Sequence, residues 1–396
     1  MTNKPMTNMS SRVAGWQEFI NTLSTLPDRM LDALPAAMRD DPQIQQEVGR
    51  LALESLAHST LAAIGGDGDA PQFLPSLGQI LNIGQPNADT IYRSATITPG
   101  GSYRLTGRRG SLSLAVLSQV VPRQPSKRKH LELASLRVDD SDRFELIIGP
   151  ARPDGYDGDW WELDPAASQI MIRMVSADWG NEVDPTLSIE RIDIPLGRTR
   201  PPAEVLEQRL RTLPVIVDTM ALMFAGHLEK LRQEGYVNAL KVLTLEFGAL
   251  DGQFYYEGIF DLADDEALII ESPIPAQCEY RSLILINEIY ETIDWYNNHS
   301  SLNGAQAAPD PDGMLRIVVS ARDPGVKNWL DTAGHPRGVI QGRWTGCDSQ
   351  PIPIVHKVKV GDIMEKLPAG VATVTAEERQ EIVRRRRAAL QQRPLW

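Results

Sequence analysis

The residues best suited to chemistry lie in the stretch DPGVKNWLDTAGHPRG (323–338), which follows the strand-like run MLRIVVS (314–320). His335 is a candidate general acid–base group, because imidazole exchanges a proton near neutral pH. Asp331 lies nearby in the same loop and can hold that imidazole in one tautomer. Arg337 can bind a substrate beside them. The alternative is a packed turn between two strands, the more common role of a single loop histidine.

The next run, GVIQGRW (338–344), adds Arg343 and Trp344 to this group. Pairing of the strands on either side of the loop brings its two ends together. We therefore expect both side chains to contribute to substrate binding near His335.

A second group lies in GQPNADTIYRSATI (84–97), at the start of another predicted strand. Tyr92 is a candidate proton donor, Arg93 can bind a substrate carboxylate, and Asn87 is a candidate binding residue. Because neighbouring strand residues point to opposite faces, at most one of Tyr92 and Arg93 lines a given pocket. The alternative is that Asn87 and Asp89 close a turn and Tyr92 packs.

A third group lies in IYETIDWYNNHSSLNGAQAA (289–308). The functional interpretation is an aromatic-walled pocket with Asp294 or His299 as the base, and with Tyr290 and Trp295 as binding residues. The alternative is the C-terminal end of a helix, which the asparagines terminate.

The common catalytic signatures are absent. The sequence has no GxGxxG after a strand, no GxxxxGK[ST], no HExxH and no GxSxG. We therefore expect no organic cofactor and assign no metal. A metal-dependent variant stays open, with His335, Asp331 and Asp294 as its candidate ligands.

Composition narrows the partners and the compartment. The chain has 396 residues, a formal net charge of −12 and a pI of about 5.1, which disfavours nucleic acid. Cys278 and Cys347 form no CxxC pair; a disulfide between them is possible but not implied, and we expect two reduced thiols in a cytoplasmic protein. The polar start and the short apolar runs predict no signal peptide and no membrane span. The basic run Arg384–Arg387 is expected to be a solvated helical turn.

The elements that must position these residues form five predicted regions. Apolar residues at helical spacing indicate helices near the N-terminus, interrupted by Pro27 and Pro35, and a long helix with a kink near Pro214. Thr375 and Glu378 predict a capping box for a C-terminal helix. The regions are an N-terminal helical region (1–75), a first β-rich half (76–200), the long helix (201–240), a second β-rich half (241–350), and a C-terminal extension with the basic helix (351–396).

The strands cluster together and do not alternate with helices. We therefore predict an α+β protein with an antiparallel β-sandwich or jelly-roll-like core, an N-terminal helical region, a long central helix and a C-terminal tail helix. Within the second β-rich half, YRSLILIN (280–287) is expected to be a strand that leads into a short helix, EIYETIDWY (288–296).

The same motifs carry a family resemblance. PNADTIYRSATI with SYRLTGRRG, YRSLILINEIYETIDWYNNHSSLN, and DGMLRIVVSARDPGVKNWLDTAGHPRGVIQGRW together resemble the bacterial family catalogued as domain of unknown function twelve-fourteen, over residues 80–350. The resemblance implies a β-sandwich or jelly-roll type architecture with outer helices, often in multimers. It supplies no catalytic residues.

Two functional hypotheses follow. The first is a cofactor-independent lyase, decarboxylase or isomerase that transfers a proton on a small hydrophobic or aromatic organic acid. The second is a non-catalytic β-sandwich protein that binds a small ligand or a sugar; a purely structural role in assembly ranks last. We expect a homo-oligomer with no nucleic acid and no membrane partner. The catalytic hypothesis requires the three groups to meet around one cavity.

Overall fold

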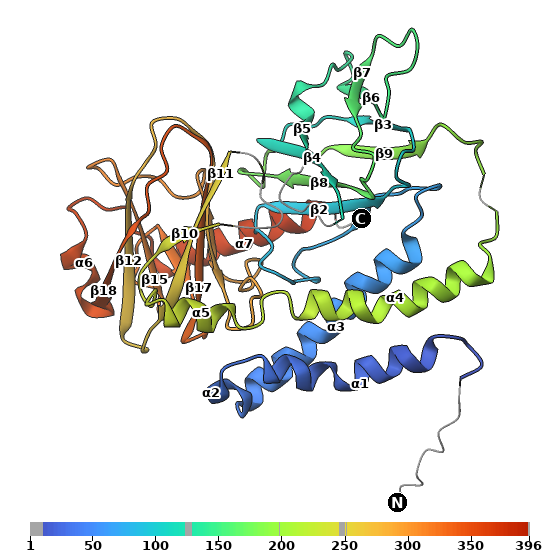
Figure 1. Ribbon diagram of the computed structural model, residues 1–396. Coiled ribbons are helices and arrows are strands. Elements are labelled where there is room, and N and C mark those ends of the chain that lie inside the picture. Colours follow the sequence, from blue (N-terminus) through green and yellow to red (C-terminus); the bar gives the residue numbers. More distant parts are fainter. Residues whose placement is uncertain (1–10, 123–128, 198, 245–249, 251, 395–396) are drawn as a thin grey trace, which may run out of the picture.

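The computed structural model describes residues 11–122, 129–197, 199–244, 250 and 252–394, and it combines helices with antiparallel-dominant sheets (Figure 1). This confirms the α+β class. The predicted regions that begin at residue 1 and end at residue 396 reach outside the described residues. The helices are α1 (Trp16–Asp32), α2 (Ala36–Arg39), α3 (Pro42–Gly65), α4 (Ala203–Ala221), α5 (His227–Gln233), α6 (Ile363–Lys366) and α7 (Ala376–Gln392).

The first pair of sheets encloses one apolar core. A five-stranded sheet, in the order β1-β2-β8-β4-β5, faces a four-stranded sheet, in the order β7-β6-β3-β9. In β8, Ile170, Ile172 and Met174 are buried in this core, so Arg173 between them points out of it. The strands are β1 (Leu74–Pro75), β2 (Thr90–Thr96), β3 (Tyr103–Arg108), β4 (Leu114–Val120), β5 (His130–Glu132), β6 (Arg143–Gly149), β7 (Asp159–Glu162), β8 (Gln169–Val175) and β9 (Thr186–Arg191).

The second pair of sheets encloses a separate core. A five-stranded sheet, in the order β10-β11-β17-β13-β14, faces a four-stranded sheet, in the order β16-β15-β12-β18. The sequence predicts one sandwich core, and the structure divides the strands between two. The strands are β10 (Lys241–Leu243), β11 (Gln253–Asp261), β12 (Glu266–Pro273), β13 (Cys278–Ile286), β14 (Ser301–Asn303), β15 (Met314–Ser320), β16 (Trp329–Asp331), β17 (Arg337–Cys347) and β18 (Ile354–Lys359).

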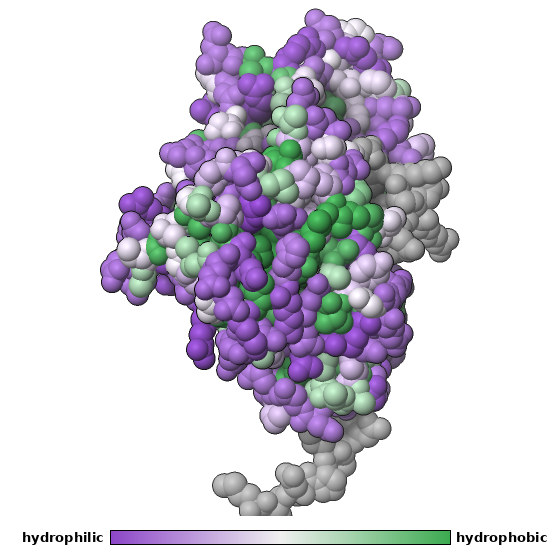
Figure 2. Space-filling model, turned by 90° about the vertical axis from the view of Figure 1, so that its left-hand side faces the viewer, coloured by the Kyte–Doolittle hydropathy of each residue, from purple (hydrophilic) through white to green (hydrophobic). Residues whose placement is uncertain are grey.

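A layer of helices packs against the second pair of sheets. Helices α1, α3 and α4 contact one another, and their apolar faces share a cluster with Ile259, Ile284 and Val339 of the adjacent sheet (Figure 1). Asp41 begins α3, because its Oδ1 accepts the backbone N–H of Gln43 at 2.8 Å. The face that Figure 2 shows, on the side of the second pair, is mostly hydrophilic with separate hydrophobic patches.

Helix α7 extends from the second pair of sheets to the first (Figure 1). Its predicted capping box is confirmed, since Thr375 and Glu378 exchange both capping hydrogen bonds. Within the basic run, Arg384 and Arg385 are exposed, but Arg386 is only 6% exposed. The expectation of a fully solvated turn is therefore wrong for Arg386.

Three predicted helical features differ in the structure. Helix α1 continues through Pro27. The central helix includes Pro214 but ends at Ala221, and α5 begins only at His227. Residues 288–296 form turns in place of the expected short helix, because Asn287 accepts the N–H groups of Ile289 and Glu291 and closes a local turn.

The two cysteines are bonded to each other. Cys278 and Cys347 lie directly opposite on the neighbouring strands β13 and β17, and their sulfur atoms form a disulfide. The prediction of two reduced thiols is wrong, because sequence spacing does not reveal which strand ends pair. Among the described residues, no helix is both long and apolar enough to span a membrane.

Candidate functional sites

His335 lies in the turn that joins β16 to β17. Ala333 and Gly334 adopt positive φ angles of 51° and 88°, so the chain reverses tightly. Asp331 stabilises this turn, because its Oδ1 accepts the backbone N–H of Ala333 at 2.7 Å. The N–H of His335 bonds to the carbonyl of Thr332 at 3.0 Å. Asp331 therefore shapes the loop and is not the predicted partner of the imidazole.

Glu288 is the residue that orients the imidazole. Its Oε2 lies 2.9 Å from Nδ1 of His335, and the Glu288 side chain is only 7% exposed. Burial opposes protonation of His335, but the hydrogen bond and the charge of Glu288 outweigh it and raise the pKa of His335. A carboxylate at Nδ1 leaves Nε2 as the atom that can exchange a proton with a substrate.

A cleft of about 280 Å³ lies beside this pair, and we call it the His335 cleft. Met38 and Ile44 supply apolar surface from the helical layer, and Arg337 also lines the cleft. Among the described residues, no hydrogen bond or ion pair engages the Arg337 guanidinium. Asp41 and Glu47 also line the cleft, but Asp41 already caps α3. The cleft therefore combines an oriented imidazole with an available cation.

A second cavity of about 280 Å³ lies at the other end of α3, and we call it the Tyr92 cavity. Tyr92, Trp295 and Tyr296 supply aromatic surface to its lining. Asp294 does not line it. Its Oδ1 instead accepts the N–H of Tyr296 at 2.9 Å and the side-chain amide of Gln79 at 3.2 Å. Asp294 therefore positions the wall and is not placed to act as a base.

A buried polar cluster joins the two pairs of sheets around Asp89. Asp89 accepts hydrogen bonds from Trp179 Nε1 at 2.8 Å, Tyr280 Oη at 2.5 Å and Asn303 Nδ2 at 2.8 Å. Burial raises the pKa of Asp89, although these three donors oppose that shift. Asn87 donates to Tyr280 Oη at 2.7 Å. Asn87 is thus part of a network between the two pairs of sheets. Its side chain also donates to Thr90, and this bond is the local turn contact that the alternative interpretation predicts.

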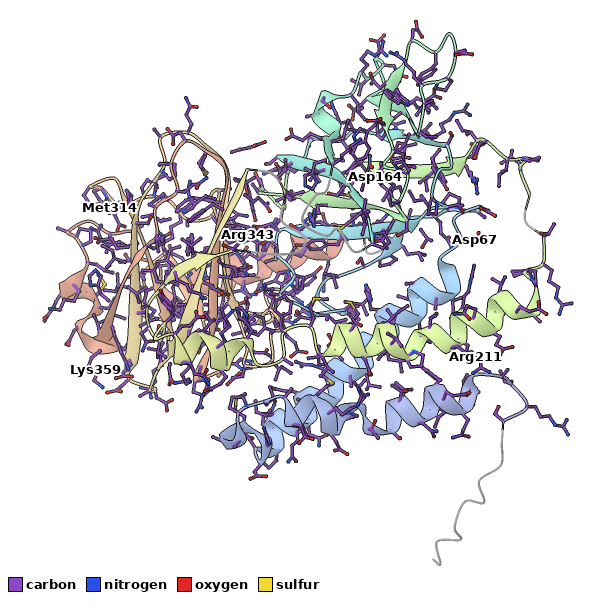
Figure 3. The ribbon with its side chains drawn as sticks, viewed as in Figure 1. Asp67, Asp164, Arg211, Met314, Arg343 and Lys359 are labelled. Carbon is purple, nitrogen blue, oxygen red and sulfur yellow. A yellow bond between two sulfur atoms is a disulfide. The ribbon has the colours of Figure 1, made fainter. Side chains whose placement is uncertain are left out.

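Arg343 belongs to the same buried face of the second pair of sheets, where Figure 3 shows it on the side toward the first pair. Its Nη2 donates to Gln341 at 2.8 Å, and its guanidinium lies 5.2 Å from the centre of the Tyr255 ring. Gln341 in turn donates to Gln85 at 2.8 Å. Arg343 does not line the His335 cleft, so its predicted position beside His335 is wrong.

Three further candidate residues, Tyr290, Trp344 and His299, pack within the protein and line neither of the two cavities. Tyr290 stacks on Phe224 with ring centres 4.9 Å apart. Trp344 lies in the second core and donates to the carbonyl of Pro351 at 2.9 Å. His299 stacks on Trp329, and burial lowers its pKa well below the usual value.

Arg93 lines neither cavity. Its Nε and Nη2 are buried without a hydrogen-bond partner, and burial lowers its pKa while the charge of Asp184 opposes that shift. Tyr92 and Arg93 thus face different surroundings, as their neighbouring positions on a strand predict.

The three groups do not meet around one cavity. The His335 cleft and the Tyr92 cavity share no lining residue, and Arg93 and Asp294 line neither. Ile44 lines the first and Ala57 the second, and 13 residues of α-helix correspond to roughly 20 Å. The structure joins His335 with Arg337, and Tyr92 with Trp295, but it separates these two pairs.

Sequence reasoning missed Glu288 and Tyr280. Glu288 lies 47 positions from His335, and Tyr280 lies 191 positions from Asp89, so spacing alone gives no sign of either contact. Asn287-Glu288 directly after the buried strand β13 is the one local signal for Glu288, because a carboxylate beside an apolar run needs a partner. Within the described residues, no group of three His, Cys, Asp or Glu side chains is arranged to hold a metal ion.

Comparisons with known proteins give similarity in structure. No family model matches the chain, and no curated protein matches it. The crystal structure of an uncharacterized protein from Burkholderia cenocepacia is similar with a TM-score of 0.80 and 26% identity, over 88% of this chain and 97% of that chain. A protein from Vibrio parahaemolyticus has a TM-score of 0.47 and 12% identity, over 79% of this chain and 99% of that chain. The first similarity supports the fold, and neither name gives an activity.

Proposed function

We propose that the protein is a cofactor-independent enzyme that transfers a proton on a small organic acid bound in the His335 cleft. The observation that carries this proposal is the Nδ1–Glu288 contact of 2.9 Å on the wall of a 280 Å³ cleft that also holds Arg337. His335 is the acid–base group, Glu288 orients it, and Arg337 binds the carboxylate of the substrate.

The proton moves between the substrate and Nε2 of His335. In an isomerase, Nε2 takes a proton from carbon, the bonding electrons form an enolate, and the imidazolium returns the proton at another position. In a lyase, the same electrons form a carbon–carbon double bond while the bond from the adjacent carbon to the leaving group breaks, and the imidazolium gives its proton to that departing group or to solvent. Met38 and Ile44 favour a hydrophobic substituent. The aromatic walls expected for this site lie at the Tyr92 cavity, so aromatic stacking is not required of the substrate.

A contrasting pair supports the choice of His335. His227 Nε2 lies 2.9 Å from Glu257 Oε1, and its ring contacts Tyr290 edge-on at 5.1 Å. His227 lines neither of the 280 Å³ cavities. The His227–Glu257 pair therefore packs within the protein, whereas the His335–Glu288 pair lines a cleft large enough for a small ligand.

The test follows proton exchange, which does not depend on the identity of the product. A panel of 2-oxo acids and arylacetic acids is incubated with the protein in D₂O, and loss of the C–H signal next to the carboxyl or carbonyl carbon is measured by NMR. We expect His335→Gln to slow exchange by about 10²-fold or more. His356→Gln, on the exposed part of β18, is the matched control. Equal exchange in the His335 variant, or none with any acid, contradicts the proposal.

The pH dependence gives an independent check on Glu288. A general base must be neutral, so the exchange rate should rise with pH through the pKa of His335. Because Glu288 raises that pKa, Glu288→Gln should shift the rising limb to lower pH and reduce the plateau rate. A limb that does not move would remove Glu288 from the orienting role.

The remaining expectations stay predictions. They are the resemblance to the family of unknown function twelve-fourteen, the jelly-roll-like strand arrangement, the homo-oligomer, the lack of nucleic-acid partners and the cytoplasmic location. The disulfide weighs against the last of these, because reducing compartments keep most thiols free.

A further inference from the structure

We propose that the Tyr92 cavity is a second binding site, independent of His335, for a small neutral aromatic compound. The cavity lies between α3, strand β2, the segment 75–81 and residues 295–296. Its lining is predominantly apolar, with Leu61, Ala88 and Leu390 among the contributing residues. No part of the His335 cleft contributes to it.

The size of the cavity selects the size of the ligand. An engineered apolar cavity of about 150 Å³ accommodates benzene. The Tyr92 cavity has about 280 Å³, close to twice that volume, which suits a bicyclic ring system. Trp295 and Tyr296 offer aromatic surfaces against which such rings pack.

The charges around the cavity favour a neutral ligand. Among the described residues that line it, Arg393 alone carries a charged side chain. Its Nη2 and Nε donate to the Asp184 carboxylate at 2.7 and 3.0 Å, and its remaining hydrogen bonds go to the carbonyls of Asp89 and Met174. The guanidinium is thus neutralised and occupied, so it offers little to a carboxylate.

Tyr92 is one of the uncharged polar side chains of the lining, together with Ser76, Gln79 and Thr90. The hydroxyl oxygen of Tyr92 accepts the backbone N–H of Asn87 at 3.2 Å, which leaves its proton for another acceptor. A ring system with a single hydroxyl or carbonyl oxygen therefore matches the site. This is the class that the cavity would take, and naphthalen-1-ol is a suitable probe.

The experiment measures binding of naphthalen-1-ol to the full chain by isothermal titration calorimetry. Ala57→Trp and Leu61→Trp place bulk at the lining and should abolish binding. Leu53 lies on the same stripe of α3, is 67% exposed and does not line the cavity. The control variant Leu53→Trp should therefore bind naphthalen-1-ol like the natural protein. Tyr92→Phe keeps the ring, removes the hydroxyl and should weaken binding about five-fold.

Other results overturn the proposal. Binding that survives both Trp substitutions on α3 places the ligand elsewhere, and no binding at all refutes the site. Pro394 lines the cavity and is followed in the sequence by Leu395 and Trp396. Binding that appears only in Trp396→Ala would mean that this side chain competes for the cavity, and it too would overturn the proposal. Proton exchange at His335 is a separate readout, so either proposal can fail alone.

Discussion

Glu54 shows how its surroundings change the charge of a single residue. Burial and the negative charge of Glu291 raise its pKa to about 7, although the backbone N–H of Asn82, at 2.7 Å, and the charge of Arg50 oppose the shift. In an unfolded chain the pKa of a glutamic acid is near 4.3, which is about three units below the pKa of Glu54 in the folded protein. The folded protein therefore holds an extra proton between about pH 4 and 7.

The sign of the pH effect follows from this raised pKa. The stability that Glu54 contributes is fully present below the unfolded pKa and is lost as the pH rises through about 7. The glutamine of Glu54→Gln cannot ionise. The free energy of unfolding of this variant, relative to the natural protein, should therefore be higher at pH 8 than at pH 5 by about 1–2 kcal/mol. Urea denaturation at both values measures it. Glu365→Gln, at an exposed position, is the control, and equal gains at both pH values would contradict the prediction.

Residue types in the sequence singled out the candidate groups of the His335 turn, but not the partner of the imidazole. Asp331 ends β16, Arg337 begins β17, and His335 lies in the short turn between them. The carboxylate at the imidazole is Glu288 and not Asp331, because the turn geometry directs Asp331 to a backbone N–H. Local chemistry is visible in sequence, whereas a contact made by folding between distant segments is not.

At the scale of elements, α7 and the residue after it tie the molecule together through three buried arginines. Arg379, Arg386 and Arg393 are seven positions apart, which places them along one helical face. Arg379 contacts Asp323, and the Arg386 guanidinium lies 4.5 Å from the centre of the Trp179 ring. Arg393 pairs with Asp184 next to the first pair of sheets. Arg386 of the basic run thus belongs to a buried stripe, whereas its neighbours Arg384 and Arg385 are exposed.

Substitutions on this stripe should be far more harmful than those beside it. Arg393→Met leaves Asp184, whose side chain is 8% exposed, without its partner, and should lower the free energy of unfolding by about 3–5 kcal/mol. Arg385→Met removes a charge whose side chain is 78% exposed and should cost less than about 0.5 kcal/mol. Denaturant unfolding compares the two. Similar losses in both variants would show that the stripe carries no special role.

Element types followed from periodicity better than element ends did. The capping box of α7 was predictable because Thr375 and Glu378 act within one turn. The turns at 288–296 were not, because Asn287 closes the chain with side-chain hydrogen bonds that compete with a helix. Strand β18 joins β12 from the C-terminal extension, and only tertiary packing decides that pairing.

At the scale of the whole molecule, the Asp89 cluster joins the two pairs of sheets. The Tyr280 hydroxyl crosses from β13 to Asp89, at the start of the first pair. Tyr280→Phe removes this donor and should lower the free energy of unfolding by about 1–3 kcal/mol. Tyr156→Phe breaks an exposed hydrogen bond to Glu145 at 3.2 Å and serves as the matched control.

The form of the unfolding transition tests the shared interface. Because the Asp89 cluster and α7 contact both pairs of sheets, we expect one transition in the natural protein and in Tyr280→Phe. Two separate transitions in the natural protein would mean that the cores unfold independently. The division into two cores was not predictable, because alternation marks each strand's buried face but not which strands share a core.

The bond between Cys278 and Cys347 closes a covalent ring around a separation of 69 residues. Glu288 and His335 both lie within that ring. Even in a denatured chain they remain tethered, so the entropy lost when they find each other is smaller than in an open chain. A reducing agent would therefore slow the return of the Glu288–His335 contact during refolding. Protein refolded with and without a reducing agent should differ in how quickly any activity returns.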